Sequence, residues 1–353
     1  MLASTKTLRF AALFALGSLL FACEEDDITE RPDLQVPDTY ASSNFAANTA
    51  AEAEVLDQLG SLTSDLNSIE ADGTPAELSY PATLESVTLS AYAARINEWL
   101  DEVEQAAGNT FDLENAPAGE GGILGTRLLD EYGLELEQMI EKGSFGAALY
   151  NHALDVLSAP VTEASVDQLV EVFGADPTFN PDETRFSATY AKRRSDNTAE
   201  TGYLYDIEDN LITAKAAVTA GPEYDPELSA ALSSFLRNWE ESNFATVIFY
   251  ANAAKTQIQN AGDDPVALGN AMHAYGEAVG FTAGWKGLGT KEISDAEIDQ
   301  ILALLLAEEG AAPESYRFLK EPALLDNFDE IIEIIRDVYD FTDEEVAGFY
   351  VNG

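Results

Sequence analysis

Residues 48–70 read NTAAEAEVLDQLGSLTSDLNSIE and decide the fold class, because their apolar side chains recur at steps of three and four residues. The α-helix turns once in about 3.6 residues, so this spacing puts the apolar side chains on one face of a helix. The positions concerned are Val55, Leu59, Leu62, Leu66 and Ile69. The stretch therefore predicts an amphipathic helix that buries one side against the rest of the protein.

Similar helical patterns follow along most of the chain, whereas the alternating patterns of strands are nearly absent. Pro226 and Pro265 suit the first turns of two long helices, and Ser294/Glu297 and Thr342/Glu345 are capping-box pairs that open two more. We therefore predict an all-α fold of antiparallel helices in one or two bundles. The other expected helices cover residues 84–107, 128–142, 145–157, 163–173, 183–195, 226–260 and 265–285.

The beginning of the chain has the parts of a secretory signal peptide, which we expect over residues 1–22. Lys6 and Arg9 give it a basic start, and an apolar run follows from Phe10 to Phe21. This run has 12 residues, which is too few for a membrane-spanning helix, since that needs about 20. The pattern is typical of a segment that is cleaved after export.

Cys23 is the only cysteine, and it closes the run Leu20-Phe21-Ala22-Cys23, which predicts a lipidation site. Cleavage before Cys23 would leave a thiol and an amine that can both be acylated, and the lipid would tether the protein to a membrane. The alternative is an ordinary cleaved signal with an incidental cysteine. Because the single thiol would be consumed by lipid, the protein must be stable without disulfides.

Residues 23–46 are expected to form an acidic flexible tether ahead of a helical domain over residues 47–353, with a break near 174–225 if there are two bundles. The run Glu24-Glu25-Asp26-Asp27 resembles the acidic export signal with which Bacteroidota move lipoproteins to the outer face of the outer membrane. We therefore expect an outer-membrane lipoprotein that faces the cell exterior. Two alternatives stay open, a solvated linker without signal function and a location on the periplasmic face.

Acidic residues outnumber basic ones by 64 to 18, which gives a net charge of −46. Such a surface repels nucleic acid and anionic lipid headgroups. Its self-repulsion is tolerable where salt is plentiful, because the screening length falls to about 3 Å at 1 M salt. We therefore hypothesise a salt-adapted, halophilic source. A thermal melt should show stabilisation as NaCl rises, and a melting temperature that does not increase would contradict this hypothesis.

Two pairs of residues could carry chemistry. His273 and Glu277 are four residues apart in a predicted helix, and Glu137 and Glu141 have the same spacing in an earlier one. Each pair lies on one helix face, where imidazole and carboxylates could bind a divalent or iron cation. The alternative is a structural role, with His273 bonded to its own carboxylate and the glutamates at the surface or paired with Lys142. The sequence contains no Glu-x-x-His and no His-Glu-x-x-His motif, so a zincin-type protease is unsupported.

The glycines at 280, 284, 287 and 289 fit neither the dinucleotide-binding pattern nor the phosphate-loop pattern. They predict close helix packing followed by a helix-ending loop. Trp239 and Trp285 are expected in the core or at an interface between helices, and the alternative is that they line a ligand pocket.

The stretch Gly133–Gly143, GLELEQMIEKG, is similar to a segment of a Bacteroidota lipoprotein family catalogued as domain of unknown function 4856. Residues 273–281, with His273-Ala274, Glu277 and Gly280-Phe281, resemble a later segment of the same family. The resemblance runs from about Tyr40 to the end of the chain. It departs at residues 169–175, LVEVFGA, where family members carry a Trp-Asp-Glu-Ala-Phe-Gly-Tyr type of run.

This family has no established activity, so the resemblance implies only a helical surface lipoprotein. A more distant similarity is to the imelysin group, whose members are two-bundle helical proteins linked to iron acquisition and sometimes called peptidases. The Gly-x-His-x-x-Glu motif of that group is not reproduced, because His273 and Glu277 are spaced one residue wider.

The main functional hypothesis is a non-enzymatic, surface-tethered helical protein that binds a small ligand, a metal or an envelope partner, with iron uptake as a suggested setting. One alternative is an imelysin-like metallopeptidase, in which Glu277 would be the base and His273 a metal ligand. The other is a purely structural surface protein.

Overall fold

The computed structural model describes residues 31–74 and 76–353. Cys23, the predicted signal peptide and the acidic run after it lie outside these residues. Most of the described chain is helical, and its only strands form two small antiparallel hairpins, so the predicted all-α class is confirmed. Among the described helices, none combines the length and the apolar character that crossing a membrane requires.

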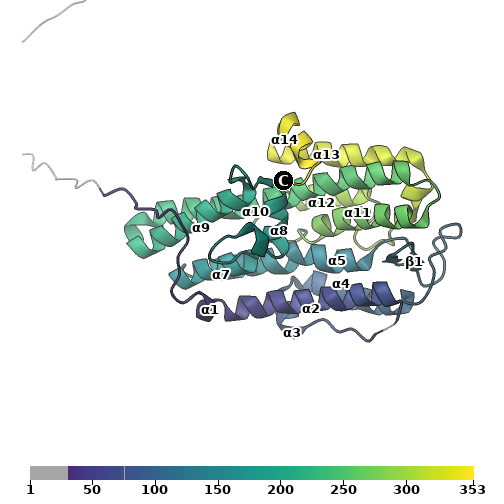
Figure 1. The fold of residues 1–353 in the computed structure, drawn as a ribbon, viewed down its shortest axis with the longest axis horizontal. Helices are drawn as coiled ribbons and strands as arrows, with labels where there is room; N and C mark the ends of the chain where they lie inside the picture. Colours follow the sequence, from purple (N-terminus) through teal and green to yellow (C-terminus); the bar gives the residue numbers. More distant parts are fainter. Residues whose placement is uncertain (1–30, 75) are drawn as a thin grey trace, which may run out of the picture. The chain divides into compact units, whose positions relative to one another are not determined.

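The elements follow one another in the order shown in Figure 1. The hairpins are β1 (Gly122–Leu124) with β2 (Arg127–Leu129) and β3 (Ser195–Asp196) with β4 (Thr201–Gly202). The α-helices are α1 (Phe45–Asn48), α2 (Ala50–Asp72), α3 (Ala82–Val87), α4 (Ser90–Ala106), α5 (Leu136–Ser144), α6 (Asn151–Leu157), α7 (Glu163–Phe173), α8 (Phe186–Arg193), α9 (Tyr203–Ala220), α10 (Asp225–Ala261), α11 (Pro265–Ala283), α12 (Asp295–Leu304), α13 (Asp326–Tyr339) and α14 (Asp343–Phe349).

The helix predicted at residues 48–70 is α2, and its predicted apolar face is buried. The helix ends where Gly73 takes a left-handed conformation with φ of 61°, which a glycine adopts without strain. Both predicted capping boxes are present, at Ser294 for α12 and at Thr342 for α14. These local signals were sufficient because each acts within a single turn of chain.

The helices pack in a layered order that Figure 1 shows. Helix α10 packs against α9, α11 and α13, helix α11 packs against α5, and α5 in turn packs against α2 and α4. Leu34–Gly353 form one compact unit, so the helices on either side of residues 174–225 belong to the same body.

The packed body begins earlier than the predicted boundary at residue 47. Tyr40 lies within the predicted tether, yet it is buried and its hydroxyl donates to Asp167 in α7. Ser42 donates to the other carboxylate oxygen of Asp167 at 2.7 Å, and Lys215 of α9 donates to the same oxygen as Tyr40 at 2.5 Å. Asp167 therefore ties the segment around Tyr40 to two helices.

The contact between α5 and α11 depends on glycine, as the sequence predicted for this stretch. A Cβ atom at Gly280 would collide with the backbone oxygen of Gln138, and a Cβ at Gly284 would collide with the backbone of Gly143. The two helix backbones therefore approach more closely than any side chain at these positions would allow. After α5 the chain makes a π-helical turn at Phe145–Tyr150, and α6 follows directly.

Alanine at Gly280 or Gly284 should destabilise the protein strongly, because the added methyl group meets backbone that cannot move aside. We expect a loss of about 1–3 kcal/mol or more in the free energy of unfolding, measured by chemical denaturation. Gly289→Ala is the control, since nothing lies within 4 Å of a Cβ there. Equal stability of Gly280→Ala and Gly289→Ala would contradict the proposed backbone contact.

Candidate functional site

The predicted pair His273 and Glu277 lies on the face of α11 that packs against α5, and both side chains are at least three-quarters buried. Nε2 of His273 is 3.6 Å from the Glu277 carboxylate, and its Nδ1 is 2.9 Å from the carboxylate of Glu135. No pattern in the sequence indicated that Glu135 contacts His273. The contact arises because α5 begins only at Leu136, so Glu135 is in extended backbone just before the helix.

The other predicted pair, Glu137 and Glu141, also lies in this region but is paired within α5. Glu137 accepts a hydrogen bond from the side-chain amide of Gln138, and Glu141 forms an ion pair with Lys142. The ammonium of Lys142 is buried and also lies 3.8 Å from Glu277. Lys142 therefore links the two predicted pairs into one buried network.

Two further groups complete this network. The hydroxyl of Tyr190 in α8 donates to Glu277 at 3.1 Å. Arg127 of β2 lies 3.7 Å from Glu135 and 3.3 Å from Glu70 of α2. The network therefore joins α2, α5, α11 and the first hairpin through charged side chains, and it reaches α8 through the hydroxyl of Tyr190.

Burial governs the protonation of these groups. It raises the pKa of Glu135 and of Glu70 to about 7, although Arg127 acts in the opposite direction on both. Burial lowers the pKa of His273 while Glu277 raises it, and the net shift is downward. Burial alone would lower the pKa of Lys142, but Glu141, Tyr190 and Glu277 raise it well above its usual value. At neutral pH the network therefore holds a neutral imidazole and a charged ammonium.

The predicted metal role does not fit this geometry. Within residues 31–74 and 76–353, no three or more His, Cys, Asp or Glu side chains are grouped so that they could hold a metal ion. Lys142 and Arg127 supply the positive charge that a cation would bring to the carboxylates. The side chains at this place thus form an ion-pair network between helices.

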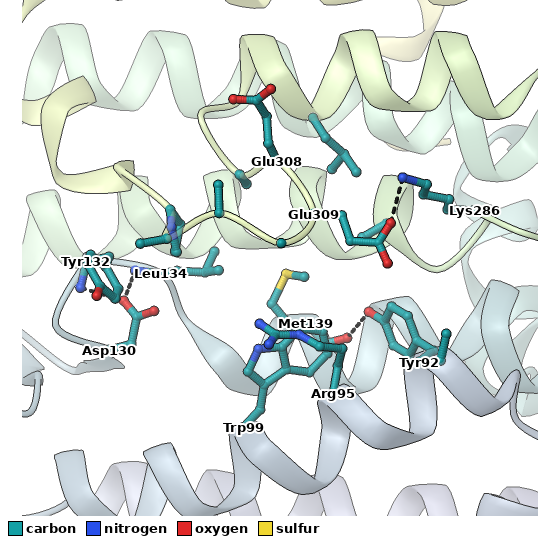
Figure 2. Close-up of a pocket in the computed structure, with 18 of the residues that line it drawn as sticks. Tyr92, Arg95, Trp99, Asp130, Tyr132, Leu134, Met139, Lys286, Glu308 and Glu309 are labelled. Atoms are coloured by element: carbon teal, nitrogen blue, oxygen red, sulfur yellow. Dashed lines mark hydrogen bonds and ion pairs between the residues drawn. The ribbon is translucent and has the colours of Figure 1, made fainter.

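A cavity of about 590 Å³ lies on another side of α5. Its walls come from α4, from the turn between β2 and α5, from the end of α11 and from the loop after α12, and Figure 2 shows the side chains that they contribute. Met139 of α5 lines it, so this short helix separates the cavity from part of the charged network. No pattern in the sequence predicted this cavity.

One wall of the cavity is aromatic. Tyr92 and Trp99 of α4 meet edge to face with ring centroids 5.4 Å apart, and the Arg95 guanidinium lies 5.2 Å from the centre of the Trp99 ring. The Tyr92 hydroxyl donates to the backbone oxygen of Met139 at 2.7 Å, which fixes α4 against α5 (Figure 2). The wall is therefore a rigid apolar surface with one cation on it.

Acidic groups also line the cavity. Asp130 is buried, and its Oδ1 accepts the backbone N–H groups of Tyr132 at 2.9 Å and Leu134 at 2.7 Å. Burial raises the pKa of Asp130 to about 7 despite these two hydrogen bonds. Glu102 lies at the exposed rim, and burial and neighbouring acids raise its pKa above the usual value, with Arg95 opposing them.

The cavity is also bordered by an ion-pair cluster. Lys286, just after α11, lies 2.5 Å from Asp299 and 2.6 Å from Glu309. Glu309 belongs to the loop after α12, so this ion pair holds the loop at the edge of the cavity (Figure 2). The cavity mouth is thus formed by segments that are distant in sequence.

Comparison of the chain with family models, with curated proteins and with solved structures finds no match in any of the three.

The protein should become less stable as pH rises from about 5 to about 8. Glu70, Glu135 and Asp130 have raised pKa values near 7, so in this range the folded chain binds more protons than the unfolded chain, and stability falls as those protons are lost. The summed effect should be on the order of a few kcal/mol in the free energy of unfolding, measured by urea denaturation.

Glu135→Gln should flatten this pH dependence, because glutamine does not titrate. Glu104→Gln at an exposed position of α4 is the matched control and should leave the dependence unchanged. Stability that increases with pH over this range would show that these carboxyl groups are not buried as described.

Proposed function

We propose that this protein is a membrane-tethered lipoprotein that binds a small organic ligand in the cavity beside Trp99. The observation that carries the proposal is the cavity itself, with its volume of about 590 Å³ and its mixed apolar and polar lining. Binding sites for small molecules typically have volumes of about 300–1,000 Å³ and are lined by apolar and aromatic side chains with a few polar groups.

The construction of the cavity also supports binding. Trp99 and Tyr92 are held in place by each other and by Met139, so the aromatic wall exists before a ligand arrives. Asp130 is fixed by two backbone amides. A preformed site loses little conformational entropy when a ligand enters, which favours affinity.

The location that we propose rests on the sequence around Cys23. The apolar run before it, the single cysteine and the acidic residues after it together favour export and lipid attachment, with the helical body on the outer face of the outer membrane.

Cys23→Ser should therefore shift the protein from the membrane fraction to the soluble fraction of the source cells. A variant that stays in the membrane fraction would contradict lipid tethering.

Ligand binding can be tested by filling the cavity. Ala91 of α4 lines the cavity, whereas Ala94 is an exposed residue of the same helix outside it. We expect Ala91→Trp to weaken binding of N-phenylnaphthylamine, a neutral fluorophore that brightens in apolar sites, by at least about tenfold. Ala94→Trp should bind it as the wild type does.

Fluorescence titration of the wild type and the two variants is the measurement, and circular dichroism verifies that each variant is folded. A wild type that does not bind the fluorophore, or an Ala91→Trp variant that binds it unchanged, would contradict the proposed function.

A further inference from the structure

We propose that the cavity takes an organic cation, a compound with an amino group on an aromatic or aliphatic body, with its ammonium beside Asp130 and its body against Trp99. This inference rests on the proposed ligand-binding function and adds the chemical class of the ligand. It follows from the charge of the cavity wall, from the unused oxygen of Asp130 and from the aromatic surface.

The cations of the cavity wall already have carboxylate partners. Arg95 lies 2.5 Å from Glu98 on the same helix, and Lys286 is held by Asp299 and Glu309. Glu98 and Asp299 do not line the cavity. The charges of Arg95 and Lys286 are therefore already balanced by carboxylates of the protein. An anionic ligand would have to compete with these carboxylates for the two cations.

Asp130 and Glu102 form no ion pair among the described residues, although Arg95 is near enough to lower the pKa of Glu102. Besides burial, the negative charges of Glu102 and Glu131 raise the pKa of Asp130. A ligand ammonium placed beside Asp130 and Glu102 would relieve this repulsion and would favour the ionised carboxylates.

Asp130 has the geometry to receive such a group. Its Oδ1 accepts two backbone amides, while no group of the described residues donates a hydrogen bond to its Oδ2. Figure 2 shows this second oxygen turned away from the two amides. Asp130 is only 6% exposed, so the hydrogen bond with an ammonium would be charge-assisted and shielded from water.

The aromatic wall suits the rest of the ligand. Trp99 is held by Tyr92, and Met139 and Leu134 add apolar surface between Trp99 and Asp130 on the cavity wall. A flat or aliphatic body would bury apolar area there at roughly 25 cal/mol per Å². The cavity thus offers an apolar surface and an anionic end, which is the pattern that an amine with an apolar body complements.

The test compares three probes that share a phenylethyl body. They are phenethylamine, phenethyl alcohol and hydrocinnamate, which end in an ammonium, a hydroxyl and a carboxylate. We expect the amine to bind about ten- to a hundredfold more tightly than the alcohol, and the carboxylate to bind most weakly. Ligand-observed NMR titration of the folded body at about 0.1 M salt gives the three affinities, since higher salt would screen the interaction.

Two kinds of variant separate the cavity from the acidic surface as a whole. Ala91→Trp should abolish amine binding, because the indole fills the cavity. Attraction of the amine to the acidic surface alone would not be affected by this substitution. Asp130→Asn should remove the preference for the amine and leave the affinity for the alcohol unchanged, since asparagine keeps an oxygen for the Tyr132 and Leu134 amides. Glu104→Gln, on the same helix as Glu102 but outside the cavity, should have no effect.

The outcomes distinguish the two proposals. Suppose that the neutral fluorophore binds in the cavity. If the alcohol or the carboxylate then binds as tightly as the amine or more tightly, or if none of the three probes binds, the cation assignment is overturned and the binding function stands. If neither the fluorophore nor any probe binds, both fail. Should Asp130→Asn not fold, the folded wild type and Ala91→Trp decide, and a preference for the amine that Ala91→Trp leaves unchanged overturns the assignment.

Discussion

The close approach of the α5 and α11 backbones is the constraint on which the rest of the structure depends. It is possible only because Gly280 and Gly284 carry no side chain where α11 crosses α5. Once the two helices lie at this distance, the side chains on either side of the glycines have little room and must face one another. The placement of His273 and Glu277 opposite α5 is a direct consequence, and so is the fixed position of Met139 between the charged network and the cavity.

This constraint also explains why so many charges are buried in one place. Helix α5 is short and is enclosed by α2, α4 and α11, so its charged residues have little access to solvent. The burial of these carboxylates is tolerated because Lys142 and Arg127 form ion pairs with them. In addition, some of them can hold a proton at neutral pH, since burial raises their pKa. A buried network of this kind costs desolvation energy, and its benefit is that only one register of the two helices satisfies every member.

The sequence predicted what depends on local periodicity. The helix at residues 48–70, the capping boxes and the close packing at Gly280 all follow from spacing within a few turns of chain. The contact of Glu135 with His273 was missed because the sequence predicted a helix over residues 128–142, whereas α5 begins only at Leu136, and because the two partners are 138 positions apart. The cavity was missed for the same reason. Trp99 reads as an ordinary core residue in its own helix, and only the fold brings Asp130 and the loop at Glu309 to the same space.

Tyr40 is the first buried side chain of the described residues, and its contact with Asp167 draws the segment ahead of α1 into the helical body. Asp167 of α7 accepts hydrogen bonds from Tyr40 and Ser42 through its two oxygens, and Lys215 of α9 donates to the oxygen that Tyr40 uses. The start of the body is therefore held in place by side chains that the chain supplies more than a hundred residues later.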